Sequence, residues 1–158
     1  MGSAPQAVRV DPYRAFNFLV TLVDSGAGSG PPQQSQASGG FSECTGLDIS
    51  LDVEEYKEGG NNVCILRFPT RVKWSNLRLK RGLATSDELW LWHFGFVNGQ
   101  VVRRDGVVTL QDEQQNAVKT WSFTRGLPVK WTGPSLNAAQ NQIAIEELEI
   151  AHEGLKLL

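Results

Sequence analysis

The stretch Leu47–Glu54, LDISLDVE, decides the fold class of this chain. Its apolar residues, Leu47, Ile49, Leu51 and Val53, alternate with Asp48, Ser50, Asp52 and Glu54. Successive side chains of a β-strand point to opposite faces of the sheet, so this alternation predicts a strand with one dry face and one wet face. The tetrapeptide Gly59-Gly60-Asn61-Asn62 follows shortly after it and predicts a turn or loop tip.

Segments on both sides of this strand predict a mainly β protein. Upstream, Phe16, Phe18, Val20 and Leu22 share one parity within Tyr13–Asp24. Downstream, strands are predicted over Val63–Phe68 and Val72–Arg81, interrupted at Pro69, with a bulge near Ser75-Asn76 where the apolar parity slips. Val101–Asp112 and Ala117–Arg125 are predicted to form a hairpin through the polar turn Glu113–Asn116.

One helix is predicted after the basic strand. Thr85 followed by Glu88 matches a capping box, the run LWLWHFGFV at 89–97 comes next, and Asn98-Gly99 supplies a stop. Apolar side chains surround most of this helix, so we expect cover on more than one side, with a neighbouring chain as a candidate for the second.

The C-terminal stretch, IAIEELEIAHEGLKLL at 143–158, fits two structures. Its alanine, glutamate and leucine content favours a helix. The alternation of Ile143 with Ile145, and then of Leu148 with Ile150, favours a strand that slips at Glu146-Glu147. The residues alone leave both open.

The chain length of 158 residues favours a single domain over 1–158. We expect residues 1–12 to be an N-terminal extension. Residues 25–39, SGAGSGPPQQSQASG, lack the apolar content to pack and predict a flexible low-complexity insertion loop between two strands.

Composition narrows the function classes. Hydrophobic residues make up 41% and charged residues 20%, as in an ordinary soluble globular protein. A net charge of −2 lacks the basic excess of a general nucleic-acid binder, so no specific nucleic acid is expected. No apolar run approaches the ~20 residues of a membrane span, and the N-terminus has no secretory signal, so no membrane anchor of its own is expected.

The sequence gives no catalytic motif, so we expect no enzyme activity, no cofactor and no metal site. Cys44 and Cys64 lack nearby histidines for a metal cluster, because the histidines are His93 and His152. We expect semi-buried thiols in a chain folded in the cytoplasm. The crowded acidic residues around Asp48–Glu58 and Glu146–Glu153 are typical of solvated strand faces.

Charge is segregated along the chain. Every charged residue from Arg67 to Arg81 is basic, and nearly every one from Asp48 to Glu58 is acidic. A basic strand beside acidic strands gains about 0.2–1 kcal/mol per cross-strand pair. The pairing can lie within one subunit or between subunits, where complementary charge fixes register and partner.

Five blocks, in order, resemble the tail tube protein family of contractile phages and of phage-derived extracellular injection systems. They are GFSECTGL (40–47), EEYKEGG (54–60), LKRG (79–82), PVKWTGPSLNA (128–138) and IAIEELEIAHEGL (143–155). The resemblance implies a β-sandwich or small barrel with one flanking helix, and it makes the C-terminal block a strand. It also implies that six copies close into a ring around a β-lined channel and that rings stack into a tube.

The resemblance further implies that Tyr56–Trp74 is an extended hairpin or loop that reaches a neighbouring subunit. Together with the basic strand, this gives a hypothetical subunit interface of Tyr56, Gly59, Gly60, Arg67, Arg71, Lys73, Trp74, Arg78, Lys80 and Arg81. Such machines carry a trunk subunit, repeated along the shaft, and a tube initiator next to the baseplate. This chain resembles the initiator more than the trunk subunit in three features: the EEYKEGG block, the tryptophan-rich helix and the PVKWTGPSLNA block. The secreted ring protein of a related secretion system is a further alternative.

The partners implied are stacked tube rings, baseplate hub and spike proteins, the sheath protein and cargo in the lumen. The implied location is a phage tail or tail-like injection particle, released or attached to an envelope.

Overall fold

The computed structural model describes residues 14–15, 17–25, 40–57, 59–60, 65–83 and 85–158. These residues form β1 (Phe18–Asp24), β2 (Phe41–Thr45), β3 (Ile49–Tyr56), β4 (Leu66–Trp74), β5 (Leu77–Gly82), α1 (Glu88–Val97), β6 (Arg104–Gln111), β7 (Ala117–Thr132), β8 (Ile145–Ala151) and β9 (Gly154–Leu157). Several features of the sequence lie wholly or almost wholly outside the described residues: the predicted extension at 1–12, the predicted insertion at 25–39, Asn61-Asn62 and Cys64. No helix in the described part of the chain is long and apolar enough to span a membrane.

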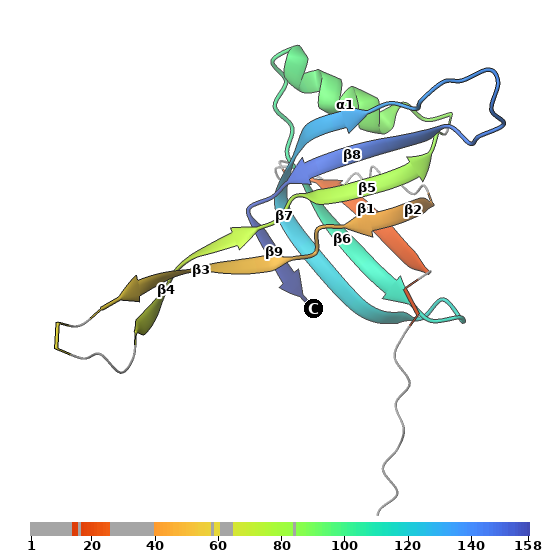
Figure 1. The fold of residues 1–158 in the computed structure, drawn as a ribbon. Helices are drawn as coiled ribbons and strands as arrows, with labels where there is room; N and C mark the ends of the chain where they lie inside the picture. Colours follow the sequence, from red (N-terminus) through yellow and green to blue (C-terminus); the bar gives the residue numbers. More distant parts are fainter. Residues whose placement is uncertain (1–13, 16, 26–39, 58, 61–64, 84) are drawn as a thin grey trace, which may run out of the picture.

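One antiparallel sheet forms the body of the protein, with the strand order β1-β6-β7-β8-β5-β2 and β9 beside β7 (Figure 1). The 16 residues of β7 belong to two layers, since its first half pairs with β6 and β9 and its second half with β8. The bend falls at Arg125-Gly126, where Arg125 has a φ of 54° and a Cβ on Gly126 would lie 2.7 Å from the carbonyl oxygen of Arg104. For the residues that the structure describes, mainly β structure with one flanking helix is therefore confirmed, and the end strands β1 and β2 do not pair to close a barrel.

The hydrophobic core fills the space between these layers. It consists of Val20, Leu22, Val108, Phe123 and Leu155 from one layer, Phe41, Leu77, Leu79, Leu148 and Ile150 from the other, and Leu89 and Trp92 of the helix. The indole Nε1 of Trp92 donates to the carbonyl oxygen of Val102 at 2.8 Å, which ties the helix to the segment before β6.

The predicted capping box of the helix is wrong. The helix begins after Asp87 without a side-chain capping bond, and the Glu88 carboxylate instead accepts from Arg104 at 3.1 Å. That pairing directs Glu88 to β6 and away from the backbone N–H groups of the first turn. The predicted stop is confirmed, because Asn98 is the C-cap and Gly99 follows with a φ of +77°. Leu91 and Val97 remain exposed.

The C-terminal block forms strands β8 and β9, as the family resemblance implies. The predicted slip at Glu146-Glu147 is wrong, since β8 pairs with β5 in unbroken register and Glu146, Leu148 and Ile150 all point inward. Glu146 can occupy an inward position because Arg81 lies directly opposite it and supplies an ionic partner inside the protein.

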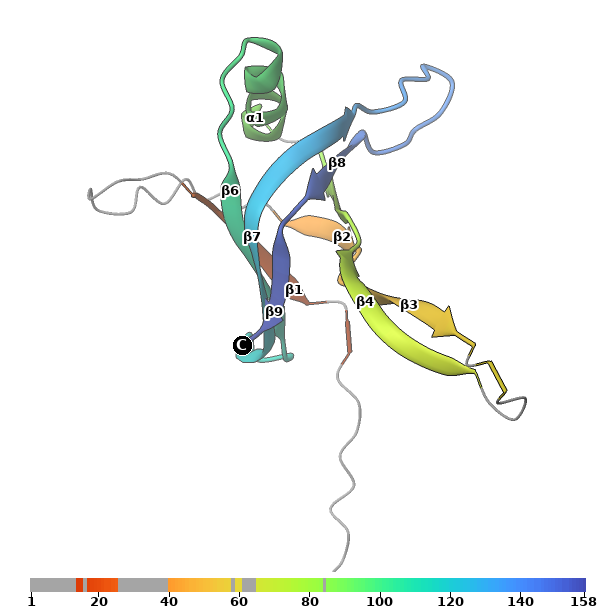
Figure 2. The ribbon, with the colours of Figure 1, turned by 90° about the vertical axis from the view of Figure 1, so that its left-hand side faces the viewer.

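A two-stranded hairpin of β3 and β4 projects from the body as a separate sheet, and we call Ile49–Trp74 the arm (Figures 1 and 2). It continues the β2–β5 pair beyond Thr45 and Arg78. The predicted strand break at Pro69 is wrong, because β4 runs through Pro69 opposite Val53 next to a bulge. Ser75-Asn76 does not form a bulge within one strand and instead separates β4 from β5.

Candidate assembly site: the arm and the charged face of the body

The arm exposes apolar side chains that the sequence pattern assigned to a buried face. Ile49, Leu51 and Val53 are 61%, 51% and 51% exposed. Cross-strand pairing sets Val72 beside Leu51 and Pro69 beside Val53, which extends this apolar face over both strands. Leu47 packs against the core, but the rest of the expected dry face is dry only if another surface covers it. A hairpin of two strands is at best marginally stable in water without such cover.

Some of the charged side chains of the arm pair across the hairpin. The guanidinium of Arg67 lies 3.0 Å from the Glu55 carboxylate, and Lys73 Nζ lies 2.7 Å from Asp52. No ion pair of Arg71 occurs among the described residues. Exposed pairs of this kind contribute about 0–1 kcal/mol each, so they orient the two strands more than they stabilise the arm.

Tyr56, Gly59 and Gly60 lie toward the distal end of the arm, and Trp74 lies at its root. Tyr56 is exposed, and Gly60 has a φ of +104°, as a turn residue without a Cβ allows. Trp74 is half-buried and packs against the core. The predicted interface residues of the arm thus extend along its whole length.

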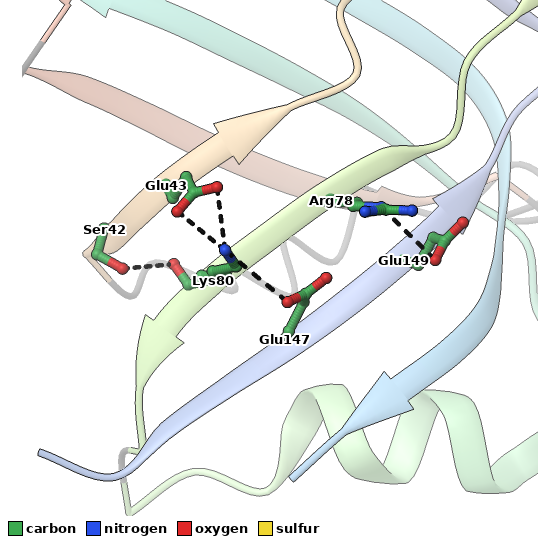
Figure 3. Close-up of polar contacts among 6 residues, drawn as sticks. All are labelled: Ser42, Glu43, Arg78, Lys80, Glu147 and Glu149. Atoms are coloured by element: carbon green, nitrogen blue, oxygen red, sulfur yellow. Dashed lines mark hydrogen bonds and ion pairs between the residues drawn. The ribbon is translucent and has the colours of Figure 1, made fainter. Parts of the chain in front are cut away.

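Arg78 and Lys80 lie on β5, on the face of the body away from the core. Lys80 Nζ contacts Glu43 of β2 at 3.0 Å and Glu147 of β8 at 4.0 Å, and Arg78 lies 3.7 Å from Glu149 (Figure 3). The intramolecular alternative for charge matching is thus realised for these residues. The outcome is a charged face across β2, β5 and β8 on which basic and acidic side chains alternate.

Arg81 lies on the opposite side of β5, inside the body, and is 3% exposed. Its Nε donates to Glu146 Oε1 at 2.6 Å, and the second oxygen of Glu146 accepts from the indole of Trp131 at 3.0 Å. The Arg81 guanidinium also donates to the carbonyl oxygen of Ser86 at 3.1 Å and lies over the Phe41 ring. The structure thus separates Arg81 from the other predicted interface residues.

Sequence reasoning missed the residues that connect the arm to the body. His152 contacts Ser75 and packs near Trp74, and Gly46 has a φ of +90° at a point where a Cβ would overlap the carbonyl oxygen of Asn76. The isolated glycine between two strand patterns was an available signal. Among the described residues no three potential metal ligands gather, and the two grooves lined by Asp24 and Arg104 and by Thr45 and Glu149 are open to solvent.

Comparison with known proteins agrees with this architecture. A chain of the anti-feeding prophage baseplate, in a 6-fold symmetrised structure, superposes with a TM-score of 0.83 at 26% identity, covering 95% of this chain and 97% of that one. A chain from the sheath–tube complex of the PVC extracellular contractile injection system gives 0.77 at 24% identity, with 100% and 99% covered. A type six secretion system protein shares the fold, with 0.57 at 13% identity and 89% and 83% covered.

No match was found among curated protein sequences. The family model of the T4-like virus tail tube protein gp19 matches residues 14–156. That match spans nearly the whole described chain, from before β1 to β9, and agrees with the tube and baseplate chains that share its fold. The protein therefore belongs to the T4-like virus tail tube protein family.

Proposed function

We propose that this protein is a structural, non-enzymatic subunit of the inner tube of a contractile injection system, and that six copies form each ring. The observation that carries the proposal is the arm, whose apolar face is exposed in the single chain. Burying one valine, leucine or isoleucine side chain contributes about 1.5–3 kcal/mol, so several such residues supply a strong drive for contact with a neighbouring subunit.

The ends of the body sheet support ring formation. β1 and β2 terminate the strand order, so each has one edge without a strand partner among the described residues. Exposed edges invite pairing with another chain, and a closed ring of identical subunits satisfies all of them at once. The 6-fold symmetry of the anti-feeding prophage baseplate gives the number of copies that we propose.

The charged face of β2, β5 and β8 is proposed to line the channel of this ring. Its acidic residues Glu43, Glu147 and Glu149 are balanced by Arg78 and Lys80 and by Lys130, which is in register with Glu149. A polar face with balanced charge has no strong attraction for cargo of either sign. The rest of the subunit surface would then contact stacked rings and the sheath.

Within the particle we propose a position next to the baseplate hub and spike, as a tube initiator. The baseplate chain of the anti-feeding prophage gives a TM-score of 0.83, against 0.77 for the PVC sheath–tube chain, and its identity is 26% against 24%. The trunk subunit of the shaft is the second candidate, favoured by the same fold match to the sheath–tube complex.

Negative-stain electron microscopy of the purified protein tests ring formation. The wild type is expected to form six-fold rings, and a Leu51→Ser, Val72→Ser variant is expected to remain monomeric with unchanged circular dichroism. Val101→Ser is the matched control, because Val101 is also exposed but lies in the link after α1, outside the arm. Rings formed equally well by the arm variant, or a monomeric wild type at high concentration, would refute the proposal.

Tube growth from the purified protein distinguishes the tube initiator from the trunk subunit. An initiator alone is expected to stop at single or paired rings until a trunk protein is added. Long tubes grown from the purified protein alone would instead identify the trunk subunit.

A further inference from the structure

The helix α1 presents an uncharged stripe to solvent. Its inner side is covered by the core, but the side chains at spacing i, i+1, i+4 and i+7 are exposed: Trp90, Leu91, Phe94 and Val97. After Glu88 the helix contains no aspartate, glutamate, lysine or arginine. A helix that is apolar around most of its circumference needs cover on both sides. We call these four residues the stripe.

The stripe is held in place by contacts within the chain. The ring of Trp90 stacks on Phe94 with centroids 5.3 Å apart and meets the ring of Trp131 in a T-shaped arrangement at 4.7 Å. The indole N–H of Trp131 in turn donates to Glu146 at 3.0 Å. Side chains that are already ordered lose little conformational entropy when a partner binds, so the stripe is a preformed docking surface.

The arm carries the second uncovered apolar surface of the chain. Ile49, Leu51, Val53 and Val72 are all at least half exposed. Both views of the ribbon place α1 and the arm far apart, with α1 beside β7 and the arm projecting away from the body (Figures 1 and 2). The two apolar surfaces therefore do not cover one another within a single chain.

We infer that the stripe on α1 receives the apolar face of the arm of a second copy of this chain. The inference rests on the proposed function, because it names the surface of the neighbouring subunit that covers the arm. One such contact covers both apolar surfaces, whereas pairing of two arms, or of two helices, leaves the other surface bare.

The two surfaces match in length. From Ile49 to Val53 an extended strand advances by about 13 Å. From Trp90 to Val97 a helix advances by about 10 Å. The row of apolar side chains on the arm can therefore lie along the whole stripe.

Unmatched charges flank the two surfaces. Arg71 lies beside Val72, and Asp87 lies one helical turn before Leu91, whose backbone N–H donates to the Asp87 carbonyl oxygen at 2.8 Å. Neither Arg71 nor Asp87 forms an ion pair with any described residue. A contact that sets Val72 against Leu91 brings these opposite charges together, and complementary charge favours one orientation of the partner.

The inferred contact joins different surfaces of identical chains. Every subunit gives its arm to one neighbour and receives the arm of another, so the contact repeats until a ring closes. Pairing of like surfaces would stop at two copies. The two arrangements can therefore be separated by mixing variants.

Analytical ultracentrifugation of two variants tests the contact. One variant, Leu51→Ser with Val72→Ser, lacks the apolar face of the arm, and the other, Leu91→Ser with Val97→Ser, lacks the stripe. Each alone is expected to be monomeric where the wild type assembles, with association weakened by about a hundredfold or more. Their equimolar mixture is expected to form dimers, because the intact stripe of the first variant receives the intact arm of the second.

Leu136→Ser with Ile143→Ser is the matched control, since both residues are more than 80% exposed between β7 and β8 and should leave assembly unchanged. Rings formed by the stripe variant, or a mixture that stays monomeric, would overturn the inference and leave the proposed function standing. Dimers formed by either variant alone would overturn it by showing that like surfaces pair. A monomeric wild type would refute the proposed function as well.

Disulfide cross-linking decides the question if a serine variant does not fold. A chain with Leu51→Cys and Leu91→Cys, in a Cys44→Ala, Cys64→Ala background, is expected to give a ladder of linked oligomers after oxidation. Leu136→Cys in place of Leu91→Cys is expected to give none. A ladder of equal yield from both chains, or none from the first, would overturn the inference.

Discussion

Replacing Glu146 by glutamine is expected to lower the free energy of unfolding by about 3 kcal/mol, the lower end of the 3–5 kcal/mol range for breaking a buried ion pair. Both partners have side chains that are 4% exposed, so the guanidinium of Arg81 would keep its charge inside the body without a counter-ion. The glutamine amide would also direct an N–H donor toward either Arg81 or Trp131, both of which are donors. For a chain of this size the melting temperature should fall by about 6–12 °C.

Urea denaturation at one fixed protein concentration measures this change, with Glu147→Gln as the matched control. Glu147 is the next residue of β8, faces outward and lies 4.0 Å from Lys80, so its replacement should cost about 0–1 kcal/mol. A double variant, Arg81→Met with Glu146→Leu, is expected to recover most of the loss because no charge is left buried. Equal costs at Glu146 and Glu147 would show that the buried pair does not stabilise the body.

Three further changes test other parts of the structure. Gly46→Ala places a Cβ against the carbonyl oxygen of Asn76 at a φ of +90° and should cost at least about 2 kcal/mol in urea denaturation, whereas Gly40→Ala, with open space around it, should stay within about 0.5 kcal/mol. Glu88→Ala removes one of the two carboxylates that hold Arg104 and should lower the free energy of unfolding by about 1–2 kcal/mol, whereas Thr85→Ala should change it little. A larger loss for Thr85→Ala than for Glu88→Ala would instead support the predicted capping box. Burial raises the pKa of the Cys44 thiol to about 11. In a Cys64→Ser background, Cys44 should therefore react with a disulfide reagent at pH 8 about a hundredfold more slowly than a free cysteine, and the rate should rise as the pH approaches 11. A rate at pH 8 equal to that of a free cysteine would contradict the burial of Cys44.

The sequence predicted part of the body, where the periodicity of the side chains matches real burial. β1 and β6 lie within the predicted segments Tyr13–Asp24 and Val101–Asp112, and the polar turn at Glu113–Asn116 joins β6 to β7. β7 begins at Ala117 as predicted but runs to Thr132, beyond the predicted end at Arg125, and β2 was not predicted. Local pattern was sufficient here, since each of these strands has one face on the core of the same chain.

The same reasoning misplaced the arm because alternation shows which side chains need cover but not which molecule supplies it. Ile49, Leu51 and Val53 read as a core-facing set, yet all three are exposed. The opposite error occurred at Glu146, a buried residue that the sequence pattern assigned to a slip in the strand. The pattern could not show its ionic partner, because Arg81 lies far away in the sequence. Long-range pairs of this kind leave no local signal.

The interface residues were predicted as one group from charge and resemblance, and the fold distributes them over three environments. Arg67 and Lys73 lie on the arm, Arg78 and Lys80 on the charged face, and Arg81 in the core. A run of basic residues in the sequence does not show which of these environments each residue occupies. Alternate positions of a strand face opposite ways, and the run is divided between β4 in the arm and β5 in the body.

The continuity of the arm with β2 and β5 has a mechanical consequence. A pull on the arm travels along two covalent strands directly into the body, and β5 there is bonded on both sides, to β2 and to β8. Tension along a strand loads its flanking hydrogen bonds together as shear, whereas a peeling force would break them one at a time. In a tube held together by such arms, tension on an arm would therefore be carried by the sheet of the body and not by a flexible loop.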